Sequence, residues 1–153
     1  MSKLVIENKK SIPLAKQTVL NVLRTQNIVL EKINEALKSF DLSMEQYNVL
    51  RILRGQKGSP ANMFEIQDRM IAKTSNTTRL VDKLLSKNLV TREVCPANRR
   101  KIEVAITANG LDLLQKVDPE VLKYEESLTG NLSVNELQQL NILLDKFKNT
   151  EHK

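Results

Sequence analysis

The chain has 153 residues, of which 41% are hydrophobic and 3% aromatic, with four Gly, four Pro and a single Cys. This composition favours one ordinary, mainly helical domain, and it excludes an intramolecular disulfide framework, a CxxC zinc site and wholesale disorder. The net charge of +6 is concentrated, since residues 69–101 carry nine Lys or Arg against two acids and the rest carries 15 against 16. A basic excess confined to one segment indicates a polyanionic partner.

The beginning of the chain, MSKLVIENKKSIPL, has no long apolar run followed by a small-residue cleavage site. No run of apolar residues approaches the roughly 18 that a membrane span needs. We therefore expect a cytoplasmic protein with no membrane partner.

The first half of the chain predicts two amphipathic helices. Apolar residues recur at spacings of three and four from Ile12 to about Lys38, which indicates a long helix. Ser43, followed by Gln46 three residues later, is typical of a capping box and predicts the start of the next helix. Residues 55–62, with two Gly and one Pro, predict a loop.

Two short helices should follow that loop. The first is predicted over residues 63–72, and the second begins after a break near Lys73, with Thr74 as its N-cap. Asn88 stands where a left-handed C-cap is needed. The predicted inward contacts of the two helices are Phe64, Ile66, Met70, Leu80, Leu84 and Leu85.

Two strands, residues 89–94 and 101–106, are predicted to pair across a basic turn. Thr107 should cap a helix running roughly over residues 111–128, with a kink at Pro119. Ser133 and Glu136 predict a capping box for the last helix. The apolar face of that last helix comprises Leu137, Leu140, Leu144 and Phe147.

Two short helices followed by a hairpin indicate a winged helix-turn-helix, a mainly α fold with a small β-hairpin wing. Short polar side chains and one guanidinium at the start of the second short helix suit base edges in a major groove. Lys83 and Lys87 follow Arg79 at four-residue spacing and should share one face suited to phosphate. The wing cations should enter the minor groove. The predicted DNA-binding residues are Thr74, Ser75, Asn76, Thr77, Thr78, Arg79, Lys83, Asn98, Arg99, Arg100 and Lys101.

Each of these features also has a purely structural interpretation. Polar residues at a helix start are often caps, a basic helix face is often only solvated, and an Arg-rich turn is often an exposed loop. Their joint order, and the fact that they hold the whole charge excess, favours DNA.

The segment from Leu80 to Gly110 resembles the MarR family of bacterial transcription regulators. TRLVDKL and KNLVTR look like the recognition helix and the entry into the wing, and NRRKIEVAITANG is similar to the wing signature D-x-R-x-x-x-V-x-L-T-x-x-G. FEIQDRM resembles the preceding helix. Asn98 stands where that signature has Asp, so it could hold Arg100 through a neutral bond, which is weaker than a charge-assisted one. The matching positions are Arg100, Val104, Thr107 and Gly110, with Ile106 in place of Leu.

The resemblance implies a homodimer on double-stranded DNA, in which residues 1–40 and 108–153 form the dimerisation region and residues 41–107 the DNA-binding region. The apolar stripes of the outer helices agree, because they exceed what a DNA-binding core alone could cover. We expect a sequence-specific regulator, most simply a ligand-responsive repressor, on a pseudo-palindromic operator. The alternative is a winged dimeric adaptor or anti-repressor that binds protein instead of DNA.

Many members of the family bind small aromatic or lipophilic acids between the dimerisation helices and the winged domain. The resemblance therefore implies an effector of that kind. No residue in the sequence marks its pocket. Cys95 at the hairpin is either inert packing or a redox-active thiol. The sequence lacks clustered metal ligands (its one histidine is His152), a phosphate-binding Gly loop and a nucleophile elbow, so we expect no metal, no cofactor and no enzyme activity.

Overall fold

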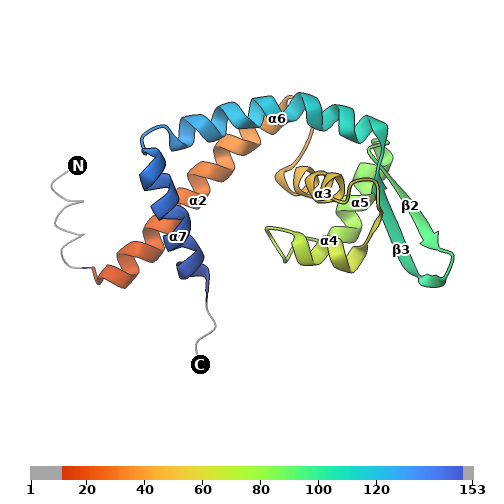
Figure 1. The fold of residues 1–153 in the computed structure, drawn as a ribbon, viewed down its shortest axis with the longest axis horizontal. Helices are drawn as coiled ribbons and strands as arrows, with labels where there is room; N and C mark the ends of the chain where they lie inside the picture. The colour runs from red at the N-terminus through yellow and green to blue at the C-terminus, as the bar shows by residue number, and fades with distance from the viewer. Residues whose placement is uncertain (1–11, 150–153) are drawn as a thin grey trace.

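The computed structural model describes residues 12–149; the N-terminal segment before Ile12 and His152 lie outside the described residues. Within that range the fold is mainly helical with a small antiparallel sheet, as predicted (Figure 1). The elements in chain order are α2 (Leu14–Lys38), α3 (Met44–Gly55), β1 (Ala61–Asn62), α4 (Met63–Arg69), α5 (Thr77–Ser86), β2 (Val90–Cys95), β3 (Asn98–Ile106), α6 (Ala108–Thr129) and α7 (Val134–Lys148).

Helix α6 spans the molecule and joins the hairpin at one end to α7 at the other (Figure 1). Helix α2 packs along α6, whereas α3, α4 and α5 gather beside the hairpin. The molecule therefore has a winged end and a purely helical end.

The hydrophobic core lies in the winged end, where the last turns of α2 and the first half of α6 close over α3, α4, α5 and β3. In contrast, α7 buries none of its residues in the single chain. The largest fully buried side chains are Leu37, Val49, Leu50, Leu53, Ile66, Val81, Leu84, Val104, Leu114 and Val117.

The sheet has the order β1-β3-β2, and β1 is a strand of two residues inside the segment predicted to be a loop. Ala61 pairs with Val104 and Asn62 with Glu103. Two residues are too few to show the alternation that marks a strand, so this pairing was not visible in the sequence. It anchors the start of α4 to the base of the wing.

The two predicted capping boxes are confirmed. Ser43 Oγ accepts from the Gln46 N–H (3.1 Å), and Gln46 Oε1 accepts from the Ser43 N–H (3.3 Å). Ser133 and Glu136 repeat the arrangement at 3.2 and 2.9 Å. Hydrogen bonding to the Ser133 N–H, and also to the Ser133 side chain, lowers the pKa of the Glu136 carboxyl, and each box satisfies two helix-end donors.

The predicted C-cap at Asn88 is also confirmed. Its φ is 60°, in the left-handed region. The Leu89 N–H donates to the Leu84 carbonyl and the Asn88 N–H to the Leu85 carbonyl, both at 3.0 Å. This pair of bonds is a Schellman motif, which ends α5 abruptly.

Thr107 caps α6, with its Oγ1 accepting from the Gly110 N–H (3.0 Å) and donating to the Asn88 carbonyl (2.8 Å). A Cβ at Gly110 would collide with the Leu89 carbonyl oxygen and the Ile106 side chain. Gly at position 110 therefore lets the first turn of α6 lie directly against Leu89 and the end of β3.

Three details of the predicted elements are wrong. Phe64 is not an inward contact of α4 but 77% exposed, since it lies about 200° around the helix from the buried Ile66. Asn76, not Thr74, is the N-cap of α5. Helix α6 begins at Ala108, three residues earlier than predicted.

Over the described part of the chain, every helix is too short or too polar to cross a membrane.

Candidate nucleic-acid interface

Helix α5 presents a polar, cationic surface, as predicted. Thr74, Asn76, Thr78, Arg79 and Lys83 are exposed. Ser75 is half-buried. These groups leave hydroxyl, amide and guanidinium hydrogen-bonding atoms at the N-terminal half of the helix.

Thr77 differs from its neighbours, because its side chain is buried and faces α4. Its hydroxyl donates to Gln67 Oε1, and Gln67 Nε2 donates to the Lys73 carbonyl. The sequence prediction counted Thr77 among the DNA-contacting residues; instead its side chain supports the turn between α4 and α5. Gln67 was missed, because nothing in its local sequence indicates a contact ten residues away.

Asn76 has a structural task at the helix start. Its Oδ1 accepts from the Arg79 N–H at 3.1 Å, and its backbone is extended. Because the oxygen is occupied by the helix, the amide nitrogen is the group available to donate to a base.

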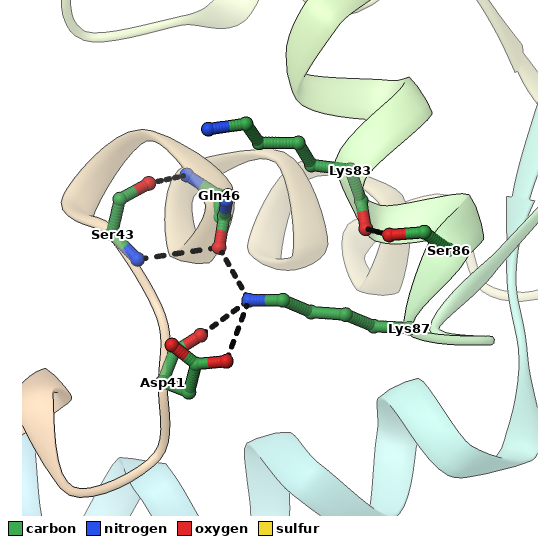
Figure 2. Close-up of polar contacts among 6 residues, drawn as sticks. All are labelled: Asp41, Ser43, Gln46, Lys83, Ser86 and Lys87. Atoms are coloured by element: carbon green, nitrogen blue, oxygen red, sulfur yellow. Dashed lines mark hydrogen bonds and ion pairs between the residues drawn. The ribbon is translucent and has the colours of Figure 1, made fainter.

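The predicted common face of Arg79, Lys83 and Lys87 is wrong in one member. Arg79 and Lys83 are exposed, but Lys87 turns towards the α2–α3 junction and contacts Asp41 and Gln46 (Figure 2). Lys87 is the C-cap residue, where the backbone leaves the helical path, so four-residue spacing no longer places its side chain on the helix face.

The three wing cations occupy a bulge rather than the turn itself. Cys95 pairs with Asn98 and Val94 with Ile102, so residues 99–101 of β3 have no partner in β2. The turn consists of residues 96–97. A bulge bends a strand and redirects its side chains, and here it displays three exposed cations in a row near the tip.

Asn98 supports this bulge through the backbone. Its Oδ1 accepts from the Arg100 N–H at 3.1 Å. The expected neutral bond to Arg100 is thus made to its main chain.

Charge pairing separates eight of the nine cations of residues 69–101 into two groups, and the ninth, Arg69, donates to Gln56 Oε1. Three of the nine cations lie near carboxylates: Lys73 near Asp68 (3.9 Å), Lys87 near Asp41 (3.6 Å) and Arg92 near Asp82 (2.5 Å). Within residues 12–149, no ion pair involves the cations Arg79, Lys83, Arg99, Arg100 and Lys101, and all five are exposed. Apart from Arg69 on α4, the cations of this segment that have no ion pair therefore lie on the exposed face of α5 and in the wing.

A second polar cluster joins the winged core to α6. Tyr47 Oη donates to Asp118 Oδ1 at 2.9 Å, and Arg54 Nη1 donates to Asp118 Oδ2. Burial of Tyr47, together with this hydrogen bond and the Asp118 charge, raises the pKa of the phenol to about 12. Sequence reasoning missed Asp118, since 71 residues separate it from Tyr47.

An open groove of about 830 Å³ lies between the end of α2, the start of α3 and the end of α5. Its lining is mostly polar and charged, and includes Glu31, Lys38, Asp41, Lys83 and Lys87. This lining mixes carboxylates and ammonium groups and holds no aromatic ring.

Cys95 is a free thiol and half-buried at the end of β2. Residues 12–149 contain no group of three or more His, Cys, Asp or Glu placed to hold a metal ion.

Comparison with known proteins agrees with this geometry. Residues 42–102, which span α3 to the middle of β3, match the family model described as MarR family. The chain is 30% identical over 117 residues to the HTH-type transcriptional repressor IacR of Pseudomonas putida, a match covering 75% of this chain and 68% of that protein.

Two solved structures extend the similarity to both ends of the fold. One is a MarR transcription factor from Planctomyces limnophilus, with 34% identity, a TM-score of 0.70 and coverage of 88% of this chain and 97% of that one. The other is a mutant MarR from E. coli complexed with operator DNA, with 25% identity, a TM-score of 0.76 and coverage of 91% and 96%. The chain belongs to the MarR family of transcriptional regulators, which are non-enzymatic DNA-binding proteins.

Proposed function

We propose that this regulator is a homodimeric repressor that binds a pseudo-palindromic operator, with α5 in the major groove and the wing in the minor groove. The observation that carries the proposal is the coincidence of exposed, unpaired cations with the N-terminal half of α5 and the bulged wing. Phosphate neutralisation supplies much of the affinity of such proteins, and base contacts supply the specificity.

In the major groove, Thr74, Ser75, Asn76, Thr78 and Arg79 form the base-reading set. Hydroxyl and amide groups can bond to several base edges, and a guanidinium matches the two acceptors of guanine. Thr77 leaves the predicted set, because it is buried. Lys83 lies one turn beyond Arg79 and suits a phosphate.

In the wing, Arg99, Arg100 and Lys101 stand in the bulge that follows the hairpin turn. The minor groove is narrow and carries a strong negative potential, which attracts an inserted arginine. We assign Arg100 to that position, with Asn98 shaping the bulge through its bond to the Arg100 N–H. Arg99 and Lys101 flank it and suit phosphate.

The homodimer is proposed from apolar side chains that the single chain leaves exposed on α2 and α7. A fully buried Leu or Ile contributes roughly 1.5–3 kcal/mol, so exposed residues of this kind on two helices are a strong drive for association. We assign residues 12–40 and 108–149 to dimerisation and residues 41–107 to DNA. The exposed residues are Leu14, Val19, Leu23, Ile28, Val134, Leu140, Ile142, Leu143, Leu144 and Phe147.

Repression and ligand response complete the proposal. The relative IacR is named a transcriptional repressor. We place the effector in the charged groove between α2, α3 and α5, whose volume falls in the range of small-molecule sites. The groove holds as many carboxylates as lysines, and the lysines are the groups with which a small organic acid would pair.

The test is fluorescence anisotropy of labelled duplexes from the region upstream of the protein's own gene, against a scrambled duplex, between 50 and 200 mM salt. A dimer that makes six or more phosphate contacts should lose about a thousandfold in affinity over that range. Millimolar benzoate or salicylate, added at fixed salt, should raise the Kd if the effector is an organic acid.

Binding that neither prefers the upstream duplex nor weakens with salt would contradict the proposal. It would favour the alternative of a winged adaptor that binds protein. An unchanged Kd in the presence of both acids would remove the organic-acid part alone.

A further inference from the structure

Lys87 ends the recognition helix, and its ammonium group is bound within the protein (Figure 2). Lys87 Nζ donates to the main-chain carbonyl of Asp41 and to Gln46 Oε1 (3.1 Å), and lies 3.6 Å from Asp41 Oδ2. Its side chain is 29% exposed. A lysine with two bound acceptors is not available to a phosphate on the outer face of α5.

The acceptor at Asp41 belongs to a second Schellman motif. The φ of Asp41 is 53°, the Leu42 N–H donates to the Leu37 carbonyl (3.4 Å), and the Asp41 N–H donates to the Lys38 carbonyl (3.2 Å). Two helix C-termini, those of α2 and α5, therefore meet at this lysine. A cation there also stabilises the negative ends of both helix dipoles.

The acceptor at Gln46 brings in a third element. Gln46 is buried, and its Oε1 accepts from both the Ser43 N–H (3.3 Å) and Lys87 Nζ (3.1 Å). One ammonium group thus joins the end of α2, the start of α3 and the end of α5. The main packing partners of α2 are α6 and α3, not α5, so Lys87 provides a direct polar link between α2 and the recognition helix.

The Asp41 carboxylate contributes less to binding the Lys87 ammonium group than the two hydrogen-bond acceptors do. The Asp41 side chain is 98% exposed, and an exposed pair at this distance contributes little. The Asp41 carbonyl and Gln46 Oε1 are therefore the contacts that hold the ammonium group.

We propose that Lys87 is a positioning residue for DNA binding, a role that rests on the proposed function. Helix α5 has ten residues, and its buried Val81 and Leu84 pack without a preferred direction. Thr77 bonds to Gln67 of α4 and Asp82 pairs with Arg92 of β2, so Lys87 supplies the polar contacts that join the C-terminal end of α5 to α2 and α3. Hydrogen bonds are directional. By fixing the C-terminal end of α5 against the α2–α3 junction, Lys87 sets the angle at which each half of the dimer presents its base-reading residues.

The experiment compares Lys87→Met with Lys83→Met in anisotropy titrations of the upstream duplex from 50 to 200 mM salt. Loss of a positioning residue should weaken binding about equally at every salt concentration, because no counterion release is lost. Loss of a phosphate contact should reduce the slope of log K against log salt by about 0.9 per contact, or roughly 1.8 per dimer. We expect Lys87→Met to weaken binding about tenfold with an unchanged slope, and Lys83→Met to reduce the slope.

Three further variants separate positioning from general stability. Lys87→Arg retains donors for both acceptors and should restore most of the affinity. Gln46→Met removes one acceptor of Lys87 and also the capping bond from the Ser43 N–H, so thermal melts measure its stability loss separately. In DNA affinity, its combination with Lys87→Met should bind no more weakly than the worse single variant, because the contact between the two side chains is lost in both. Asp41→Asn is the matched control and should bind like wild type. All are compared well below their melting midpoints, and Gln46→Met and Lys87→Arg carry the test if Lys87→Met does not fold.

A reduced salt slope in Lys87→Met would show that Lys87 contacts phosphate and would overturn the proposal. Unchanged affinity in that variant, or additive losses with Gln46→Met, would overturn it as well. In each of these cases the wild type still binds the duplex. Absence of wild-type binding would instead overturn the proposed function, and this role with it.

Discussion

Asn76 combines two tasks in one side chain. Its oxygen caps α5 through the Arg79 N–H, while its amide nitrogen remains on the exposed start of the helix. The capping bond uses one lone pair of this oxygen, so a two-bond pairing of Asn76 with adenine would share the oxygen with the helix. We expect the base preference of Asn76 to come from its amide N–H donors, which the cap leaves unused.

Asn76→Ala should cost about 1 kcal/mol of stability through loss of the cap and about 1 kcal/mol of preference at one base pair, the low end of the usual range. Asn76→Ser keeps a capping oxygen without the amide, so it should lose the preference and keep the stability. Thermal melts and anisotropy on single-substituted duplexes measure both effects. Full base preference in Asn76→Ser would exclude Asn76 as a base-reading residue.

Tyr47 contributes a pH-dependent part of the stability. The pKa of its phenol is raised from 10.0 to about 12 in the folded state, so the protonated form favours folding. This contribution is fully present below pH 10 and is lost as pH rises from 10 to about 12, because the unfolded chain ionises first. At about 1.4 kcal/mol per pKa unit, it amounts to about 2–3 kcal/mol.

Tyr47→Phe should lose about 1–2 kcal/mol at neutral pH, because the bond to the Asp118 carboxylate is removed. Its free energy of unfolding should then fall less steeply than that of wild type between pH 10 and 12. Urea unfolding at pH 8 and pH 11 tests both effects. Parallel pH dependence in the two proteins would show that this phenol is not coupled to folding.

At the scale of the element, the irregular pairing of the wing strands affects how the three consecutive cations, residues 99–101, are displayed. Three consecutive cations on a regular strand would alternate between its two faces. The bulge opposite residues 94–95 releases them from that alternation, and the Asn98 bond to the Arg100 N–H fixes the backbone there. In a regular hairpin the same three residues would lie on alternating faces of the strand.

Arg100→Ala should weaken binding to every duplex and remove a modest A·T preference flanking each half-site, since minor-groove readout is degenerate. Arg100→Lys retains the charge but lacks the planar guanidinium, so it should keep most of the affinity and lose the preference. Competition titrations with A·T- and G·C-flanked duplexes measure the two effects separately. Wild-type behaviour of Arg100→Ala would mean that the wing does not insert into the minor groove.

At the scale of the whole molecule, the helical end is incomplete as a single chain. Helix α7 has no buried residue, although its capping box and apolar positions are those of a packed helix. Apolar residues of α7 and of α2 are exposed in the single chain. A symmetric dimer would bury them and place two recognition helices roughly 34 Å apart, one turn of DNA.

Ile142→Glu, at a side chain that is 68% exposed, should convert the dimer to a monomer and abolish operator binding at micromolar protein. A charge desolvated at an apolar interface is strongly unfavourable, whereas the buried core of the winged end contains no residue of α7. Gln138→Glu, on the same helix, is the charge-matched control. Light scattering gives the mass and circular dichroism the helix content; a wild-type protein that is already a monodisperse monomer would contradict the dimer.

Features that depend on neighbours in the chain were predictable from the sequence. The two capping boxes, the left-handed Asn88, the Thr107 cap and the order of elements all follow from residues within four positions of one another. For the same reason the exposed cations of α5 and the wing could be located, because helix periodicity and a short turn determine where they lie. The family signature comes from this local set.

The rest was decided by tertiary contacts between residues far apart in sequence. The burial of Thr77 depends on Gln67 in another helix, and the direction of Lys87 depends on Asp41, 46 residues earlier. The two-residue strand β1 exists because β3 lies beside it. Local patterns determine the helices, their caps and the distribution of charge. Tertiary packing determines which polar side chains remain exposed, because a donor that bonds to an acceptor within the protein is not available to an outside partner.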